Sequence, residues 1–268
     1  MPYSQMLREL FPEITLHAED LLLLESFQIK YLPDRVAAKE FATLLNEYPV
    51  VHRFLANKYP PIGGFLAGLL QEHKPAADIH QITDHCQEAL WEIADLILYN
   101  KYPELYDRNS QIQWDISEIF SITSLEGKIV ADVGAGSGRI AFLVARHAQA
   151  VFAVEPLNSF RSFMKEKAAK LDVQNLFVMD GTLDCIALPD DSLDVLITSN
   201  AIGWKLDPEL TEIERVVKPG GHAIHLLHAE SRHEFSFKET LTSEPWKYHF
   251  TGDLVENVIK MKYYKEVI

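Results

Sequence analysis

The sequence is poor in cysteine, in basic residues and in long apolar runs. Two cysteines, Cys86 and Cys185, are too few for a disulfide framework or a four-thiolate metal site, so we expect a reducing, cytoplasmic setting. Lysine and arginine number 25 against 39 acidic residues, which gives a net charge of −14. Because the chain has no basic run for phosphate groups or anionic lipids, we predict no nucleic-acid partner and no membrane partner.

No apolar stretch approaches the ~20 residues that a membrane-spanning helix needs. The first residues, Met-Pro-Tyr-Ser-Gln, lack the pattern of a secretory signal. The length of 268 residues suits one large α/β domain plus a second piece, and an apolar share of 47 % is ordinary for a protein with a proper core. These absences favour a soluble protein that acts on small molecules.

The residue pattern changes near residue 120. Before it, apolar spacing predicts a helix from Pro33-Asp34 to Leu45, a longer helix over residues 79–99 and a short helix over 109–120. After residue 125, short apolar runs alternate with helical patterns. Strands are expected at 128–133, 150–154, 176–179, 193–198 and 222–227, and helices at 139–147, 159–171 and 208–217.

This alternation predicts a doubly wound, mostly parallel α/β sheet covered by helices on both faces. The segments 248–251 and 258–266 would add a closing antiparallel pair. We therefore expect an all-helical N-terminal domain at 1–120 and an α/β domain at 121–268.

Glycine is scarce as well, with 12 in the chain, yet Gly134, Gly136 and Gly138 stand on alternate positions directly after the first predicted strand. Glycine lets the backbone turn sharply and come close to a ligand. The helix that begins at Arg139 offers unpaired N–H groups and a positive dipole end. The pattern predicts a floor for a nucleotide-like ligand.

Polar residues follow the other predicted strands, at the carboxyl ends where open α/β sheets bind ligands. Glu155 ends the second strand, where a carboxylate can accept hydrogen bonds from both hydroxyls of a ribose. Asp180, Gly181 and Thr182 follow the third strand, and Ser199-Asn200-Ala201 follows the fourth. Two further segments, 188–194 and 218–221, come after them as markers of position.

Five segments in this order resemble the class I S-adenosylmethionine-dependent methyltransferases, in particular the small-molecule enzymes of that fold. They are Val-Ala-Asp-Val-Gly-Ala-Gly-Ser-Gly (130–138), Val-Glu-Pro (154–156), Asp-Gly-Thr (180–182), Leu-Pro-Asp-Asp-Ser-Leu-Asp (188–194) and Lys-Pro-Gly-Gly (218–221). The resemblance covers roughly residues 125–230. It implies a Rossmann-like, seven-stranded sheet, S-adenosyl-L-methionine as cofactor and S-adenosyl-L-homocysteine as product.

The resemblance also implies roles for single residues. Gly134, Ala135 and Gly136 would lie under the methionine part of the cofactor, with Asp132 near its amino group. Glu155 would hold the ribose hydroxyls, and Pro156 would flank the adenine. Gly181 and Thr182 would touch the adenine edge, while Asn200 and Ala201 would line the wall near the sulfonium. Many relatives carry Asp where Thr182 falls, so Asp180 or the backbone would have to serve the adenine amino group instead.

The predicted function is methyl transfer from S-adenosylmethionine to a small-molecule acceptor by in-line displacement, with the N-terminal domain capping the site and selecting the acceptor. The sulfonium methyl is already activated, so the protein must chiefly position the acceptor and exclude water. A general base is needed only if the acceptor loses a proton, and His228 and Tyr106 are the candidates. No metal site is predicted.

Two other functions remain open. A non-catalytic protein that binds S-adenosylmethionine or a partner could use the same scaffold. A nicotinamide-dependent oxidoreductase also has a glycine loop and a ribose-binding acid, but its fingerprint requires glycine at position 139, where this chain has Arg139.

Overall fold

The computed structural model describes residues 3–74, 78–108, 114–229, 238–255 and 258–268. The chain divides into two compact units, Met1–Asn109 and Ser110–Ile268. We had expected the division at residue 120, after the short helix α9 (Ile116–Phe120). That helix packs within the second unit instead, since Ile119 is fully buried in an apolar cluster with Val130.

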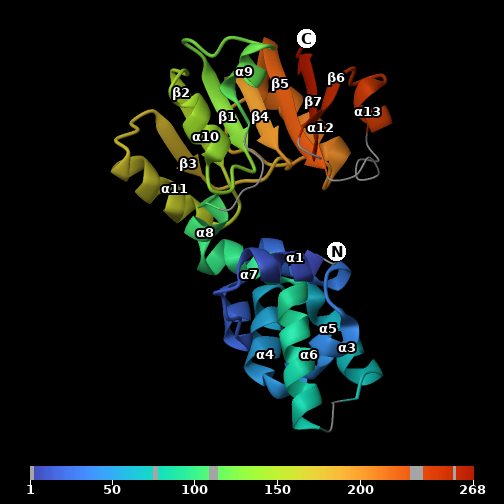
Figure 1. Ribbon diagram of the computed structural model, residues 1–268. Coiled ribbons are helices and arrows are strands. Elements are labelled where there is room, and N and C mark those ends of the chain that lie inside the picture. Colours follow the sequence, from blue (N-terminus) through green and yellow to red (C-terminus); the bar gives the residue numbers. More distant parts are fainter. Residues whose placement is uncertain (1–2, 75–77, 109–113, 230–237, 256–257) are drawn as a thin grey trace. The chain divides into compact units, whose positions relative to one another are not determined.

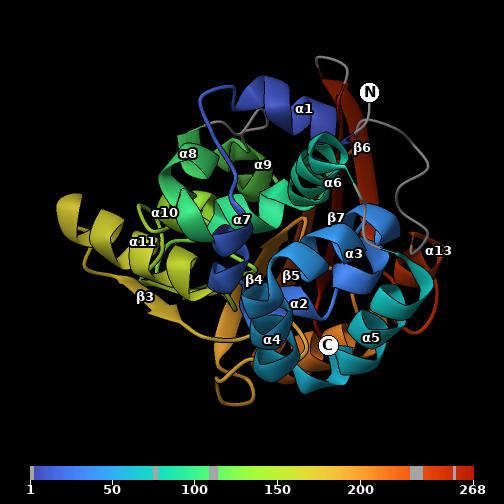
Figure 2. The same ribbon diagram turned by 90° about the horizontal axis from the view of Figure 1, so that it is seen from below.

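The elements assigned in the described part of the first unit are all helical (Figure 2). Helices α3 and α6 pack against each other, as do α3 and α5, and enclose an apolar core of their own. The elements are α1 (Tyr3–Leu10), η1 (Ala18–Leu23), α2 (Ser26–Ile29), η2 (Leu32–Asp34), α3 (Ala38–Glu47), α4 (Pro49–Lys58), η3 (Pro60–Ile62), α5 (Gly63–Glu72), α6 (Ile79–Glu92), α7 (Ala94–Lys101) and α8 (Pro103–Arg108).

Three helix predictions differ from the structure in this half of the chain. Pro33 and Asp34 form part of a short 3-10 turn, and the helix proper begins at Ala38. The helix expected over residues 79–99 is divided at Ile93, whose φ of −120° and ψ of 23° leave the helical region. Of the helix expected at 109–120, only Ile116–Phe120 is seen, capped by the Asp115 side chain, and residues 109–113 lie outside the described part.

The second unit contains a seven-stranded sheet in the order β3-β2-β1-β4-β5-β7-β6 (Figure 1). Strands β1 (Ile129–Val133), β2 (Ala150–Val154), β3 (Leu176–Met179), β4 (Leu193–Ser199) and β5 (Val217–Ala229) are parallel. Strands β6 (His249–Val255) and β7 (Val258–Glu266) close the sheet as an antiparallel pair, and β7 runs antiparallel to β5. The predicted fold class and its closing pair are confirmed.

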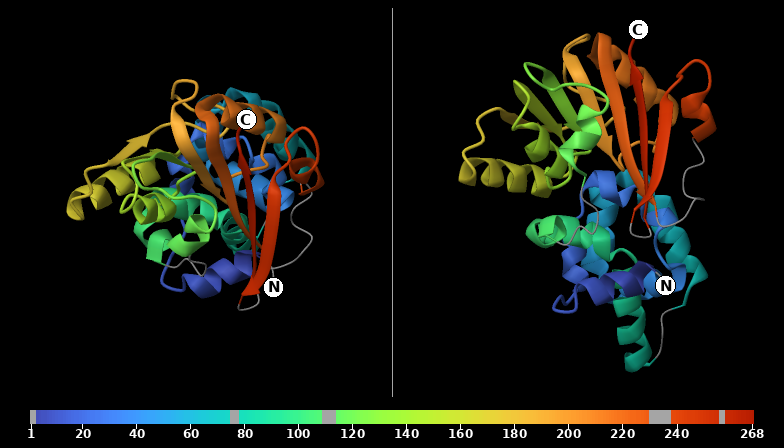
Figure 3. Two further views of the ribbon diagram at one scale, coloured as in Figure 1. Left: turned by 90° about the horizontal axis from the view of Figure 1, so that it is seen from above. Right: turned by 45° about the horizontal axis from the view of Figure 1, so that its top comes forward.

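Helices cover both faces of this sheet, which fans from β3 to β6 (Figure 3). α9, α10 (Arg139–Val144) and α11 (Asn158–Lys170) bury residues such as Ile140 and Met164 against one face. α12 (Leu206–Val216) and α13 (Lys238–Thr242) bury Ile213 and Leu241 against the other. Because it is covered on both sides, the sheet has strands with largely apolar runs, such as all of β2 and Val195–Ile197 in β4, rather than a regular alternation.

Strand β5 begins earlier than its apolar run suggests. Leu193 pairs with Val217 and Val195 with His222, so residues 218–221 form an irregularity within the strand. Gly221 lies against the backbone there, where a Cβ would come within 2.9 Å of the Asp194 carbonyl oxygen. The glycine is therefore required by close packing of the two strands.

A fully buried histidine lies in the middle of β5. The Nδ1 atom of His225 is 2.8 Å from the hydroxyl of Thr198 on β4, and its ring lies 5.1 Å from that of Tyr248 between centroids. Burial lowers the pKa of His225 to about 3. The neutral imidazole is therefore the form that the folded core accepts.

This burial predicts a pH-dependent stability. A histidine in the unfolded chain has a pKa of about 6.5. As the pH falls below that value, His225 becomes protonated in the unfolded chain but stays neutral in the folded protein. The contribution of the neutral His225 to the unfolding free energy is therefore present above pH 6.5 and is lost progressively below it. Relative to a His225→Phe variant, the wild type should lose about 2 kcal/mol of unfolding free energy between pH 7 and pH 5.

Urea denaturation of both proteins at pH 7 and pH 5 isolates the effect of His225. Every other ionisable group is present in both proteins, so its contribution cancels in the comparison. Asp132, for example, has a raised pKa and works in the opposite direction. Equal pH dependence in the two proteins would contradict the assignment.

Candidate functional site

The order of the strands reverses between β1 and β4, and the predicted site residues gather at the carboxyl ends on either side of this switch point. The loop after β1 and the loop after β4 touch there. A Cβ on Gly134 would overlap the Cβ of Ala201, and Gly134 has a φ of +71°, a conformation that favours glycine. The structure thus brings together two predicted site residues that lie far apart in the sequence.

Asp132 ends up inside the protein beneath the glycine loop. Its Oδ2 accepts a hydrogen bond of 2.8 Å from the backbone N–H of Ala141 at the start of α10. Its Oδ1 is buried and has no hydrogen-bond partner among the described residues. Burial, together with the nearby Glu155, raises its pKa to about 7 in spite of the Ala141 bond. A cationic group brought near this carboxyl would favour its ionised form.

Glu155 fastens the glycine loop to the end of β2. Its Oε2 accepts from the backbone N–H of Gly136 at 2.8 Å, and its Oε1 accepts from the N–H of Leu157 at 2.9 Å. The backbone N–H groups of Gly134 and Ala135 donate to the carbonyl of Val154. Because of these bonds, the buried carboxylate lies directly beside the loop, as the ribose-binding role requires. Pro156 follows it at the start of the turn into α11.

The residues after β3 separate into an exposed part and a fixed part. The Asp180 side chain is 74 % exposed and pairs with Arg161 at 3.0 Å, while Arg161 also donates to the Glu155 carbonyl at 2.7 Å. Gly181 is pressed against β2, where a Cβ would lie 2.8 Å from Cγ1 of Val154. Thr182 is fixed by its neighbours, and its hydroxyl lies 2.6 Å from Oδ1 of Asp184.

Asn200, which follows β4, contacts His228 near the carboxyl end of β5. Asn200 has a φ of +52°, and its Oδ1 accepts the backbone N–H of His228 at 3.0 Å. Its Nδ2 lies 2.6 Å from Nδ1 of the His228 ring. Partial burial, with Arg139 and Lys260 nearby, lowers the pKa of His228 to about 4. The imidazole is therefore neutral at pH 7 and can accept a hydrogen bond.

Tyr106, the other candidate for a base, lies on α8 in the first unit. Its ring packs edge-on against Tyr99, with centroids 4.9 Å apart. Both candidate roles stay predictions. In the described parts of the chain, no cluster of three or more His, Cys, Asp or Glu side chains could hold a metal ion, and no helix among those residues is long and apolar enough to cross a membrane.

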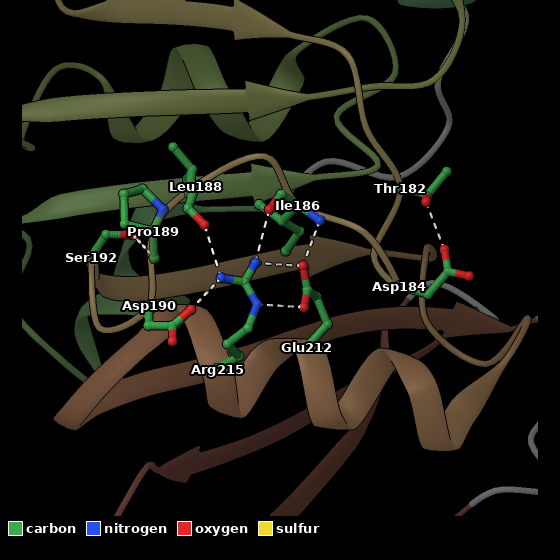
Figure 4. A network of polar contacts seen from close by, with 9 residues as sticks. All are labelled: Thr182, Asp184, Ile186, Leu188, Pro189, Asp190, Ser192, Glu212 and Arg215. Carbon is green, nitrogen blue, oxygen red and sulfur yellow. Dashed lines mark hydrogen bonds and ion pairs between the residues drawn. The ribbon is translucent and has the colours of Figure 1, made fainter.

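An arginine that the sequence pattern did not reveal holds the segment between β3 and β4 (Figure 4). All five N–H groups of the Arg215 guanidinium on α12 have an acceptor. Two go to the Glu212 carboxylate, and the others go to the carbonyls of Ile186 and Leu188 and to Asp190. These partners, Glu212 first, raise the pKa of Arg215. The Leu188–Asp194 segment, read from sequence as a marker of position, is thus the docking partner of α12.

One family model and several solved structures are similar to parts of this chain. Residues 131–225 match the family model described as a methyltransferase domain, a segment that begins in β1 and ends in β5. Among solved structures, a SAM-dependent methyltransferase from Aquifex aeolicus is 18 % identical, with a TM-score of 0.48 over 58 % of this chain and 90 % of that one.

Two further solved structures are similar to smaller parts of the chain. One is a candidate sarcosine dimethylglycine methyltransferase from Galdieria sulphuraria. It is 22 % identical to this chain, with a TM-score of 0.40 over 42 % of this chain and 43 % of that one. The [4+2]-cyclase SpnF is 18 % identical, with the same TM-score over 48 % and 52 %. Residues 131–225 are thus similar to a methyltransferase domain, and they contain strands β1 to β4 and the first part of β5.

The contact between Gly134 and Ala201 predicts that a side chain at position 134 clashes with the Cβ of Ala201, and that removing this Cβ relieves the clash. Gly134→Ala should lower the unfolding free energy by about 2–5 kcal/mol, because it combines left-handed backbone strain of about 1–2 kcal/mol with overpacking of about 1–3 kcal/mol. Urea denaturation measures the change. The matched control is Gly220→Ala, since Gly220 has a φ of +80° but nothing within 4 Å of its Cβ position.

Adding Ala201→Gly to Gly134→Ala should recover the overpacking part of the loss, because the opposing Cβ is then gone. The double variant should approach the Gly220→Ala control to within about 1 kcal/mol, the cost of the added glycine. If the double variant is no more stable than Gly134→Ala alone, the two loops do not meet as described.

Loss of the Arg215 contacts should loosen the segment from Ile186 to Ser192. Arg215→Met should lower the unfolding free energy by about 2–4 kcal/mol, because several hydrogen bonds to a charged group are lost together. Amide exchange at Asp191 and Ser192, which donate to the carbonyls of Arg215 and Val216, should accelerate. The control Arg146→Met, at an exposed position of the same unit, should change the unfolding free energy by no more than about 0.5 kcal/mol. Equal effects of the two substitutions would contradict the role of Arg215 in holding this segment.

Proposed function

We propose that this chain, whose residues 131–225 form a methyltransferase domain of the class I S-adenosylmethionine-dependent type, transfers a methyl group to a small-molecule acceptor. The observation that carries the proposal is the bond from the Gly136 N–H to the buried Glu155 carboxylate. It joins the two features that a ribose-bearing ligand needs, a close-approach glycine loop and an acid, at one place on the sheet.

Each site residue has one task in this proposal. Glu155 accepts the ribose hydroxyls; a carboxylate can take about four hydrogen bonds, so its backbone donors do not prevent this. Gly134, Ala135 and Gly136 lie under the methionine part, and Asp132 faces its ammonium group. The buried Oδ1 atom of Asp132 supports that fit, since a nearby cation favours the ionised carboxylate that burial disfavours.

The adenine then lies beyond the ribose, at the ends of β2 and β3, beside Pro156, Gly181 and Thr182. Asn200 and Ala201 line the side near the sulfonium, where the glycine loop and the β4 loop meet. S-adenosylmethionine, when bound, supplies a methyl group already activated on a sulfonium. The chain itself positions the acceptor in line with that methyl group and excludes water, which can lower a barrier by about 7–11 kcal/mol.

The acceptor is proposed to be small because the chain is acidic, at −14, and has no basic run for a nucleic acid. The helical unit is proposed to select it. If the acceptor must lose a proton, His228 is a weak candidate base: its ring is unprotonated at pH 7, but its pKa of about 4 is low for a base and the side-chain amide of Asn200 faces its Nδ1. Asn200 orients the ring through its side-chain amide.

Calorimetric titration with S-adenosylhomocysteine tests the proposal without knowledge of the acceptor. The wild type should bind it and should not bind NADH. Glu155→Gln should weaken binding about tenfold or more, because charge-assisted hydrogen bonds to the ribose are lost. The control Glu166→Gln, an exposed acid on α11, should change the affinity less than twofold.

Tight NADH binding without S-adenosylhomocysteine binding would overturn the proposed cofactor. A second assay distinguishes a protein that transfers the methyl group from one that only binds the cofactor. Incubation with S-adenosylmethionine and a panel of metabolites should release S-adenosylhomocysteine with at least one of them, above the level seen with Glu155→Gln.

A further inference from the structure

The loop between β4 and α12 carries a tryptophan at the surface of the second unit. Trp204 is 56 % exposed, and it is the largest of the strongly exposed apolar side chains in the described part of the chain. An indole ring has a large flat apolar face. Removing such a face from water is favourable, so the exposed ring offers binding free energy to any ligand that covers it.

The backbone is fixed on both sides of Trp204. The N–H of Gly203 donates to Oε2 of Glu209 at 2.7 Å, and the N–H of Lys205 donates to Oε1 of the same carboxyl group at 2.8 Å. Glu209 itself is buried on α12. The Lys205 side chain is held as well, because its Nζ lies 2.6 Å from Oδ2 of Asp184. The turn that presents the indole is therefore set by the fold before any ligand binds.

The same loop begins at the junction with the glycine loop. Ala201 lies against Gly134 there, and the buried Ile202 that follows packs into the apolar cluster of the α12 face. Trp204 comes three residues after Ala201, and because a chain spans at most about 3.6 Å per residue, their Cα atoms lie within about 11 Å of each other. A ligand held at this junction is therefore within reach of the indole ring.

The strand order separates Trp204 from the acid that would hold the ribose. In the order β3-β2-β1-β4-β5, Glu155 follows β2 on one side of β1, whereas Trp204 follows β4 on the other side. A cofactor whose ribose lies on Glu155 therefore leaves the β4 side of the glycine loop for the second reactant. The exposed indole lies on that side.

We propose that Trp204 binds the methyl acceptor by stacking its indole face on a flat ring, so that the acceptor is a small aromatic compound with the methylated atom on or beside that ring. This inference rests on the proposed function, because the bound cofactor defines which compound is the acceptor. It adds a substrate class and a specificity-determining residue, both outside the cofactor-binding residues.

The chemistry of stacking makes this proposal testable without the natural acceptor. Two aromatic rings that stack gain about 2- to 12-fold in affinity beyond what their buried area supplies. A saturated ring system with the same carbon skeleton and the same hydroxyl buries apolar area as well, but it has no aromatic face. The affinity ratio between an aromatic compound and its saturated counterpart therefore measures stacking separately from hydrophobic burial.

The experiment titrates 2-naphthol and decahydro-2-naphthol into the full chain saturated with S-adenosylhomocysteine, with calorimetric detection. The wild type should bind 2-naphthol at least about threefold more tightly than the saturated compound. Trp204→Ala should weaken 2-naphthol binding by about fivefold or more and bring the ratio close to one. Trp204→Phe retains an aromatic face and should keep a preference for 2-naphthol. The matched control is Phe177→Ala, which removes a ring that is 50 % exposed on β3 and should keep the wild-type ratio.

The outcomes separate this inference from the proposed function. If the wild type does not bind S-adenosylhomocysteine at all, the proposed function fails. If it binds S-adenosylhomocysteine but does not prefer 2-naphthol, or if Trp204→Ala keeps the wild-type ratio, only the role of Trp204 fails. Trp204→Ala should bind S-adenosylhomocysteine within about twofold of the wild type. A joint loss of affinity for S-adenosylhomocysteine and for both probes would mark a structural role of Trp204 and would also overturn the inference.

Discussion

The site depends on one attachment, the fastening of the glycine loop to the carboxyl end of β2. Gly134 and Ala135 donate to the Val154 carbonyl, and Gly136 donates to the Glu155 carboxylate. A loop of this kind carries unpaired N–H groups, and without such acceptors its conformation would be undetermined. Because the loop is fixed to β2, its other side can meet Ala201 after β4, and the ends of β1, β2 and β4 become one surface.

The same attachment is accompanied by a cost in stability at neutral pH. It places Glu155 near Asp132, and burial then leaves the Asp132 carboxyl with a pKa of about 7. A group whose pKa is raised in the folded state stabilises the fold at low pH and loses that contribution as the pH rises through 7. A core without this acid would be more stable at neutral pH. A buried carboxyl with a raised pKa fits the proposed site, in which Asp132 faces a cationic group, since perturbed groups of this kind gather at functional sites.

Much of the second unit was predictable because its signals are local. Strand–glycine–helix patterns predicted the sheet and the order of its elements, and the acid after β2 indicates where on the sheet the proposed site lies. What escaped prediction depends on contacts between distant segments. Arg215 lies about one helix and one strand beyond the loop it holds, and nothing in its own neighbourhood reveals that loop. The division of the long helix at Ile93 has no glycine or proline to announce it, and the fully buried Ile93 indicates that packing determines it.

The most direct measurement of the central claim is amide chemical-shift mapping of the labelled protein on addition of S-adenosylhomocysteine. The account predicts the largest shifts at Gly134, Gly136, Leu157 and Thr182, the amides that belong to the loop, to the Glu155 turn and to the residue after β3. Gly220, at the amino-terminal end of β5, should not move. Saturable binding that leaves these four amides unshifted, or no binding at all, would contradict the claim that this edge of the sheet holds the cofactor.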